Sequence, residues 1–306
     1  MFSKHRGEFY LFMGAFTFSI NGIFSTVVLE HMSAFRLAQI RSIGAFALLF
    51  LFAAIKRRDL LRVTRSQVPL LLAYGVFGFA LVNVGYFLGI ERKLPLGFVL
   101  ILEFTAPIWV VLWVKYVRKG FVARDMWFAI ALALIGLVLV ARVWDGFTFD
   151  LLGTLGAIGS AFALTAYFLI GERVLATRQP LSASILGIGV ASFFWLLVLP
   201  IWKFPTDIFT TQMDIHGPLA GHNFPGWSLI LWVVVMGTIV PYVFVISGLS
   251  MLSASKSSVI GMIEPVLASV FAWIWLSQGW ALVQLIGAVV VLVGIYLADR
   301  SKSAIN

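Results

Sequence analysis

The chain has 306 residues, of which 61% are hydrophobic, 15% aromatic and only 11% charged, and its mean hydropathy is +1.02. Soluble domains contain roughly half apolar and about a quarter charged residues, so this composition excludes a soluble globular protein and indicates an integral membrane protein. The formal charge of +9 would also suit a nucleic-acid-binding protein, an alternative that depends on where the Lys and Arg residues lie.

Ten apolar stretches follow one another along the chain. Each is long enough to cross roughly 30 Å of hydrocarbon as a helix of about 20 residues. In chain order the expected spans are Glu8–Leu29, Ala34–Ile55, Val68–Ile90, Pro95–Val117, Val122–Val143, Leu151–Gly171, Leu181–Trp202, Trp227–Leu249, Ala254–Leu276 and Trp280–Ala298. The sequence therefore predicts an all-α integral membrane protein with ten transmembrane helices.

The Lys and Arg residues gather on one side of this predicted topology. If the N-terminus is cytoplasmic, the inner segments hold Lys4, Arg6, Lys56, Arg57, Arg58, Arg62, Arg65, Lys115, Arg118, Lys119, Arg124, Arg173, Arg178, Lys256, Arg300 and Lys302. The outer segments hold only Arg92, Lys93 and Lys203, with Arg36 and Arg142 near helix ends. Because positive charge marks cytoplasmic loops, both termini are expected in the cytoplasm. The lipid bilayer thus accounts for the charge, and no nucleic-acid partner is expected.

An internal repeat runs through the ten expected helices. The distance along the chain from Pro107 to Gly136 equals that from Pro265 to Gly294, and the Gly14-Ala15 pair of helix one resembles Gly156-Ala157 of helix six. We therefore expect two five-helix units, residues 1–145 and 146–306. Because five is odd, the second unit enters the membrane from the opposite side. Such inverted repeats are typical of secondary transporters, whereas a merely ancestral repeat would suit a channel or an intramembrane enzyme.

The residues of these repeats resemble a known family. Glu264-Pro265 within Leu252–Leu276, the stretch from Gln284 to Gly294, Pro107 in the first half and Arg41 in helix two are similar to the drug/metabolite transporter superfamily, EamA type. This resemblance implies ten helices, both chain ends inside the cell and export of small metabolites, and we expect a bacterial inner (plasma) membrane location. Within the superfamily, the chain looks most similar to the bacterial aromatic amino acid exporters in length and in general sequence character.

Three ionisable residues fall inside the expected spans, namely Arg41, Glu103 and Glu264. A charged side chain at the bilayer centre costs about 2.5–3.5 kcal/mol on insertion scales, so each should face a cavity or a partner. Glu103 and Glu264 are predicted substrate ligands, able to bind an ammonium group or exchange a proton, with a purely structural carboxyl as the alternative for Glu264. Arg41 is expected to play a structural role or to pair with a carboxylate.

Three prolines lie near the middle of helices four, eight and nine. A proline has no N–H to donate to the carbonyl four residues earlier. Pro107, Pro241 and Pro265 therefore free the carbonyls of Glu103, Gly237 and Gly261, and we expect helices to bend there around a polar centre.

Neutral polar side chains in the expected spans also indicate this polar centre, but less specifically than the charged ones. The predicted substrate ligands of this kind are Asn21, Asn83, Tyr86, Tyr167 and Tyr242. A tyrosine can stack on an apolar substrate and hydrogen-bond its polar end, but ordinary interhelical packing explains such residues equally well.

Catalytic and cofactor motifs are missing from the sequence. The four histidines lie in termini or loops without metal-ligand spacing, and no Gly-rich phosphate loop occurs. We expect no enzyme activity, no cofactor and no metal site; the stretch Asp214–His222 is expected to be a flexible outer loop rather than a metal ligand.

These observations favour a secondary carrier that exports small amphipathic metabolites from the cytoplasm by alternating access. Amino acids with aromatic or apolar side chains are the expected substrates, and the chain is expected to act as a monomer. A passive channel or facilitator for other small metabolites is the alternative. Proton coupling and facilitated diffusion down the substrate gradient are both left open.

Overall fold

The computed structural model describes residues 5–142, 144, 150–276 and 281–301. Within these ranges ten helical spans are long and apolar enough to cross a membrane: Arg6–Leu29, Ala34–Lys56, Arg65–Glu91, Gly97–Val117, Arg124–Ala141, Leu151–Leu175, Pro180–Val198, Gly226–Leu249, Ala254–Trp275 and Leu282–Arg300. The predicted fold class, an all-α integral membrane protein with ten spans, is confirmed. The expected helix limits at Val143 and Trp280 lie outside the described residues.

Six of the ten spans are single helices. They are α1 (Arg6–Leu29), α2 (Ala34–Lys56), α7 (Arg124–Ala141), α8 (Leu151–Leu175), α9 (Pro180–Val198) and α14 (Leu282–Arg300). Side chains satisfy the free N–H groups at several of their starts. Asp150 accepts a 2.6 Å hydrogen bond from the Gly153 amide, and Glu91 accepts one of 2.7 Å from the Ala34 amide. Such caps matter here because the first turn of a helix has no intrahelical acceptor for its N–H groups.

The other four spans are interrupted near their middle. They consist of α3 (Val68–Gly75) with α4 (Val82–Glu91), α5 (Leu96–Glu103) with α6 (Ala106–Leu112), α10 (Gly226–Val234) with α11 (Val240–Leu249), and α12 (Ala254–Gly261) with α13 (Ile263–Leu276). Wider π-helical turns occupy Val76–Leu81, Trp113–Val117 and Val235–Ile239. Such turns occur often at functional sites.

The interruptions recur in the two halves of the chain. The starts of α3 and α10, of α5 and α12, and of α7 and α14 are separated by one constant offset along the sequence. The π-helical turn Val76–Leu81 has its counterpart at Val235–Ile239, and the break after Glu103 has its counterpart after Gly261. The halves therefore share a pattern of broken and continuous helices.

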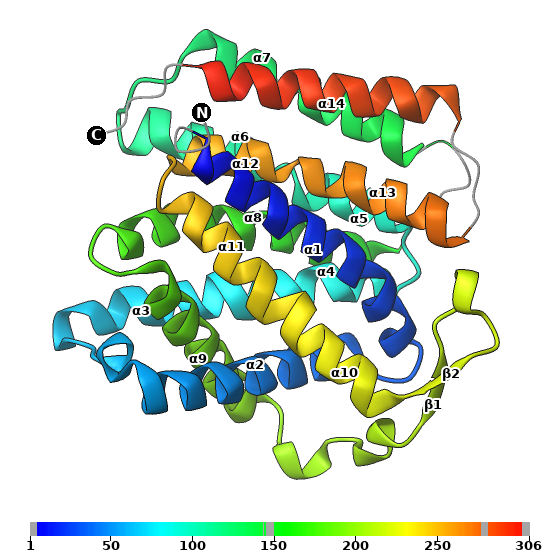
Figure 1. The fold of residues 1–306 in the computed structure, drawn as a ribbon. Coiled ribbons are helices and arrows are strands. Elements are labelled where there is room, and N and C mark those ends of the chain that lie inside the picture. The colour runs from blue at the N-terminus through cyan, green and yellow to red at the C-terminus, as the bar shows by residue number, and fades with distance from the viewer. Residues whose placement is uncertain (1–4, 143, 145–149, 277–280, 302–306) are drawn as a thin grey trace.

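The start of α1 and the end of α14 lie at one side of the molecule, and the hairpin of β1 and β2 lies at the other (Figure 1). We call these sides the terminal face and the hairpin face. Helices α7 and α14 run side by side along one edge. They approach closely because Gly136 packs on the backbone of Gly287, where a Cβ would come within 2.7 Å of the Gly287 carbonyl oxygen.

The stretch Asp214–His222, which was expected to be a flexible outer loop, connects the two short strands of a hairpin. Strand β1 (Gln212–Asp214) pairs antiparallel with β2 (Asn223–Pro225), so that Met213 lies opposite Phe224. Five short 3₁₀ helices lie in the connections, at Arg58–Leu61, Arg65–Gln67, Ile201–Lys203, Thr206–Phe209 and Gly217–Leu219. Met213 and Ile215 are buried and anchor the start of the hairpin connection, and the flexibility of the rest stays a prediction.

Candidate functional site

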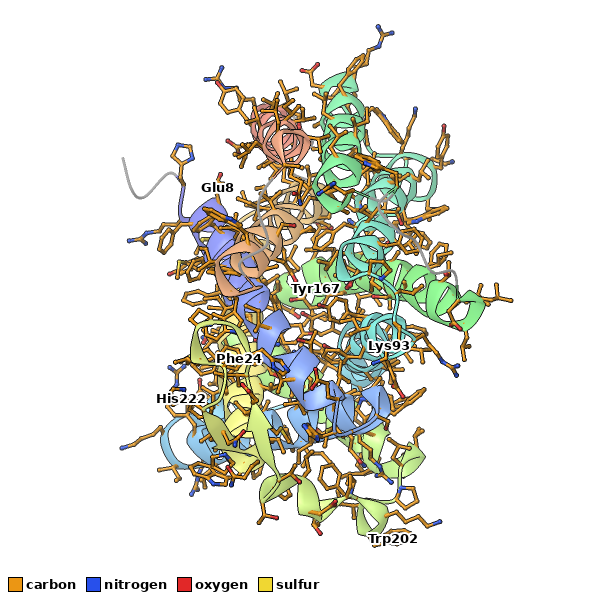
Figure 2. All side chains as sticks on the ribbon, turned by 90° about the vertical axis from the view of Figure 1, so that its right-hand side faces the viewer. Glu8, Phe24, Lys93, Tyr167, Trp202 and His222 are labelled. Atoms are coloured by element: carbon orange, nitrogen blue, oxygen red, sulfur yellow. The ribbon has the colours of Figure 1, made fainter. Side chains whose placement is uncertain are left out.

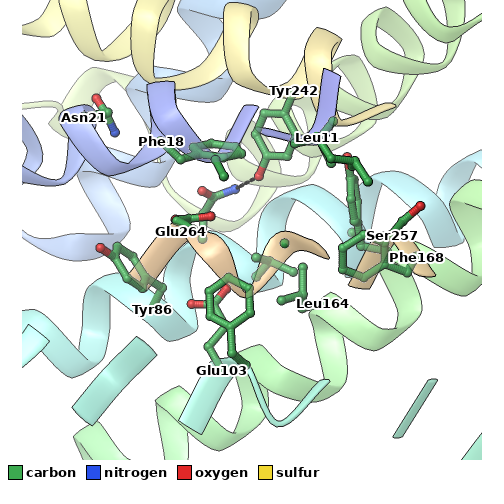
Figure 3. Close-up of a pocket in the computed structure, with 18 of the residues that line it drawn as sticks. Leu11, Phe18, Asn21, Tyr86, Glu103, Leu164, Phe168, Tyr242, Ser257 and Glu264 are labelled. Carbon is green, nitrogen blue, oxygen red and sulfur yellow. Dashed lines mark hydrogen bonds between the residues drawn. The ribbon is translucent and has the colours of Figure 1, made fainter. Parts of the chain in front are cut away.

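A cavity of about 100 Å³ lies inside the helix bundle (Figure 3). It is bounded by helices from both halves of the chain. Every predicted substrate ligand lines it, together with Arg41: Asn21, Asn83, Tyr86, Glu103, Tyr167, Tyr242 and Glu264. In Figure 2, Tyr167 lies deep among the helices, whereas Trp202 lies at the periphery. The predicted residues are thus brought together in one place, while their roles toward a substrate stay predictions.

Arg41 is fixed in this cavity by the interruption between α10 and α11. Its Nε donates a 3.0 Å hydrogen bond to Thr238 Oγ1, and its Nη2 donates to the carbonyl oxygen of Gly237. That carbonyl is one of those freed by a proline, because Pro241 in the first turn of α11 has no N–H to donate. The guanidinium group also lies 5.2 Å from the centre of the Phe87 ring. Arg41 therefore satisfies the backbone of a broken helix and leaves Nη1 without a partner among the described residues.

Glu264 stands at the interruption between α12 and α13. The helix breaks at Met262, and Glu264 lies in the first turn of α13, directly before Pro265. The Ser19 hydroxyl lies within donating distance of two carbonyl oxygens, that of Ala15 on its own helix at 2.7 Å and that of Glu264 at 2.9 Å. The carboxyl group of Glu264 has no hydrogen-bond partner among the described residues, and it lies within electrostatic reach of Glu103 and Arg41. The Glu264 carboxyl group is therefore positioned by backbone contacts and open to the cavity.

Glu103 stands at the matching interruption between α5 and α6. It is the last residue of α5, and the chain resumes as α6 at Ala106, with Pro107 in the first turn. The side chain is buried, and Ser160 of α8 lies near its carboxyl group, although the Ser160 hydroxyl donates a 3.3 Å hydrogen bond to the carbonyl oxygen of Val82. In Figure 3 the two labelled glutamates reach into the same cavity from different helices. Two carboxyl groups and one guanidinium group thus share a small, largely apolar space.

Some of the neutral polar residues bond to one another. Asn83 donates a 2.9 Å hydrogen bond to the hydroxyl of Tyr242, which joins α4 to α11 (Figure 3). Asn21 donates to Ser25 on its own helix at 3.0 Å and packs against Gly237. These contacts fit the packing alternative, whereas Tyr86 and Tyr167 present rings to the cavity.

The sequence did not identify the apolar wall of the cavity. Phe18, Phe104, Leu164 and Phe168 line it together with Ser257. Nothing in an apolar helix marks which phenylalanine faces inward, but the polar run around Ser257 in α12 was a usable signal. Trp109, Trp113 and Trp273 of the spans that carry Glu103 and Glu264 do not line the cavity but are exposed on the outside of the bundle, as befits contact with lipid.

Two contacts outside the cavity tie the far ends of the broken helices. At the terminal face, Arg118 forms an ion pair with Glu172 of α8, and Glu172 also accepts a 2.9 Å hydrogen bond from the Ala254 amide at the start of α12. Arg118 and Glu172 border a second cavity of about 650 Å³. At the hairpin face, Trp275 of α13 donates a 2.9 Å hydrogen bond from Nε1 to the carbonyl oxygen of Ile215. We call the two contacts the terminal tether and the hairpin tether.

One cluster of metal-ligand types lies on the terminal face. Ligand atoms of His5, Glu8 and Asp299 fall within 4.8 Å of one another. Lys256 Nζ lies 3.9 Å from a carboxylate oxygen of Asp299 and supplies a positive charge to the cluster. The ammonium group opposes the binding of a cation there, so the cluster suits an ion-pair network.

Comparison with known proteins gives this geometry a family context. The EamA-like transporter family matches residues 5–142 and again residues 151–298. The threonine/homoserine exporter RhtA of Escherichia coli is 29% identical over 93% of this chain and 87% of its own length. The uncharacterized transporter YdfC of Bacillus subtilis is 24% identical over 90% of this chain and 84% of its own length.

A solved structure supports the same fold. One crystal structure of a protein superposes with a TM-score of 0.74 at 14% identity, covering 95% of this chain and 96% of that chain. At that identity the likeness concerns the fold alone. The family match extends over both halves of the chain and includes every helix that borders the cavity. The chain therefore belongs to the EamA-like transporter family.

Proposed function

We propose that the protein is a secondary carrier that exports small amphipathic metabolites from the cytoplasm by alternating access. The observation that carries this proposal is the internal cavity, where Arg41, Glu103 and Glu264 from both halves of the chain meet beside an aromatic wall. Charged groups inside membrane spans are costly and mark substrate pathways. We further propose that the monomer is the working unit.

The two halves act in this proposal as inverted repeats, residues 1–145 and 146–306. Their shared interruptions and the twofold match to one family support this division. The carrier lies in the bacterial inner membrane with both termini in the cytoplasm. A reporter fused after Asn306 should then be cytoplasmic, and one inserted near Gly221 should be external. The opposite pair of results would contradict the inverted arrangement.

Amino acids with aromatic or apolar side chains are the proposed substrates, because phenylalanine rings line the cavity beside its charged groups. A second candidate class is small hydroxylated amino acids. RhtA is a threonine/homoserine exporter, and the cavity of about 100 Å³ is smaller than the roughly 300–1,000 Å³ typical of ligand pockets. The cavity volume therefore favours the smaller members of either class.

Counterflow in proteoliposomes tests the carrier against the passive channel or facilitator. Vesicles loaded with unlabelled amino acids from a panel would receive labelled amino acid outside. A carrier gives saturable uptake that is accelerated by substrate on the far side, because each reorientation moves a bound molecule. A flux that neither saturates nor accelerates would make a passive pore the better account.

A further inference from the structure

We propose that Arg41 and Glu264 together recognise the two charged ends of a zwitterionic substrate, Arg41 taking the carboxylate and Glu264 the ammonium group. This inference rests on the proposed function and specifies what its site selects. The substrate class is α-amino acids in which both the amino and the carboxyl group are free. The inference concerns these two residues because they carry opposite charges, and because Arg41 Nη1 and the Glu264 carboxyl group have no hydrogen-bond partner among the described residues.

Arg41 offers a donor of fixed position. Two of its three guanidinium nitrogens are held by Thr238 and Gly237, at the interruption between α10 and α11. The remaining nitrogen, Nη1, has no partner among the described residues and belongs to a side chain that lines the cavity. Because the planar guanidinium group is already oriented, a carboxylate can bind without further ordering of the side chain.

Glu264 offers the complementary acceptor. The Ser19 hydroxyl lies 2.9 Å from the Glu264 carbonyl oxygen, and the Glu264 carboxyl group has no hydrogen-bond partner in the described part of the chain. Glu103 differs, because it is buried whereas Glu264 is partly exposed. Glu264 also lies within electrostatic reach of Arg41, so the two open groups face one small space of opposite charges.

This arrangement discriminates by leaving charges unpaired. A substrate that lacks its carboxylate leaves Arg41 Nη1 without an acceptor, and a substrate whose nitrogen is acylated leaves the Glu264 carboxylate without a cation. An unpaired polar group in a buried site lowers affinity far more than a lost apolar contact does. The bound zwitterion would also connect the interruption of α10 and α11 to that of α12 and α13. Occupancy would thereby be linked to the arrangement of two broken helices.

Chemical analogues test the inference on the unmodified protein. The probes are L-threonine and L-phenylalanine, the methyl ester and N-acetyl derivative of each, and the corresponding amines 1-amino-2-propanol and phenethylamine. Two readouts are used, competition with counterflow in proteoliposomes and thermal stabilisation of the purified protein. At least one of the two free amino acids should compete and stabilise. Its three derivatives should be weaker by roughly 10- to 100-fold, as expected for a site that bonds both ends.

The outcomes separate this inference from the proposed function. If a derivative competes as well as its parent amino acid, the zwitterion site is wrong while amino acid export stands. If neither L-threonine nor L-phenylalanine binds or exchanges while other amino acids of the panel do, the inference is wrong and amino acid export stands. If no amino acid does either, both proposals fail.

Variants assign the two ends to the two residues. Replacing Glu264→Gln removes the acceptor charge, so the preference for the free amine over the N-acetyl derivative should fall at least about tenfold while the preference for the free acid over the ester persists. Arg41→Gln should give the reverse pattern. Because Arg41 also holds the Gly237 carbonyl, Arg41→Lys serves as a second variant that keeps a cation there. Glu8→Gln, on α1 outside the cavity, is the matched control and should keep both preferences. Equal loss of both preferences in Glu264→Gln would overturn the assignment.

Discussion

The span made of α5 and α6 and the span made of α12 and α13 are broken at corresponding positions but carry their carboxyl groups differently. Glu103 lies four residues before Pro107, at the end of α5, and the hydroxyl of Ser160 lies beside it. Glu264 lies directly before Pro265, at the start of α13, and its carboxyl group is open to the cavity. The comparison teaches that the backbone break is common to the two spans, whereas the position of the carboxyl group relative to the break decides whether the residue is buried, as Glu103 is, or partly exposed, as Glu264 is.

The two spans also differ in the contacts made at their C-terminal ends. The span of α6 ends at the terminal tether, where Arg118 meets Glu172. The span of α13 ends at the hairpin tether, where Trp275 meets Ile215. The span of α12 and α13 is thus fastened at both faces, because Glu172 also accepts a hydrogen bond from the Ala254 amide, whereas the tether of α6 lies at the terminal face.

The largest expected effect on transport distinguishes the carboxyl group of Glu264 from that of Glu103. Glu264→Gln should lower saturable amino acid exchange by roughly 100-fold, because loss of one member of a buried charge pair with the substrate costs several kcal/mol. The folded protein should persist, since the carboxyl group bonds no described residue. Counterflow with purified protein measures this. Wild-type exchange by the variant would mean that the Glu264 carboxyl group is structural.

Glu103→Gln should separate exchange from proton-driven transport. If Glu103 carries the coupling proton, the amide keeps the shape and the contact with Ser160 but removes titration. Transport driven by a pH gradient should then fail, while exchange of substrate for substrate should persist, since exchange needs no net proton movement. Full pH-driven transport in this variant would instead favour facilitated diffusion down the substrate gradient.

The prolines are expected to have a smaller, matched effect. Pro107→Ala and Pro265→Ala each restore an N–H four residues after a freed carbonyl and should straighten their helices. Transport should fall by roughly tenfold in each, the size of change seen for residues that modulate coupling without touching ligand. Proteoliposome counterflow and thermal melting would be measured together. A drop in only one of the two variants would show that one break, not both, is needed.

Breaking either tether should have a smaller effect still. Each variant should make the cavity more accessible, but from a different face of the molecule. A cysteine at Ser257, which lines the cavity, reports its accessibility to a membrane-impermeant thiol reagent. Glu172→Gln should increase labelling from the terminal face, and Trp275→Phe from the hairpin face, each by about two- to fivefold, because single partly exposed contacts are weak. Increased labelling from the same face in both variants would contradict separate gates.

The smallest expected effect concerns the stability of the hairpin of β1 and β2, which carries the hairpin tether. Backbone N–H groups of Gly221 and His216 donate to the Asp214 carboxylate and lower its pKa below the usual value. The contribution of these bonds is therefore complete above the unfolded pKa of about 3.9 and is lost as the pH falls through the lower, folded value. Hydrogen exchange of residues 212–225 should rise only under acid conditions. In Asp214→Asn this rise should disappear, and an unchanged acid response would point to another group.

Sequence patterns predicted the spans and the central residues because both follow from local chemistry. Apolar length defines a span, and a charge such as Glu264 inside one must face a cavity or partner. The sequence predicted that Pro241 frees the Gly237 carbonyl, but it did not identify Arg41 as the donor to that carbonyl. Arg41 lies 196 positions away, and only helix packing brings the two residues together. The partnership of Arg118 and Glu172 was missed for the same reason, since each lies at the end of a different span.

The central claim is that substrate crosses the membrane through the cavity between the two broken helices. Gly261 lines it, and a Cβ there would lie 3.6 Å from Phe104, so Gly261→Leu places new atoms in the cavity while every charged group stays. Gly159→Leu, on α8 with nothing within 4 Å, is the matched control. The account predicts that counterflow of amino acid falls to background in Gly261→Leu and stays at the wild-type rate in Gly159→Leu. Wild-type counterflow in Gly261→Leu would contradict it.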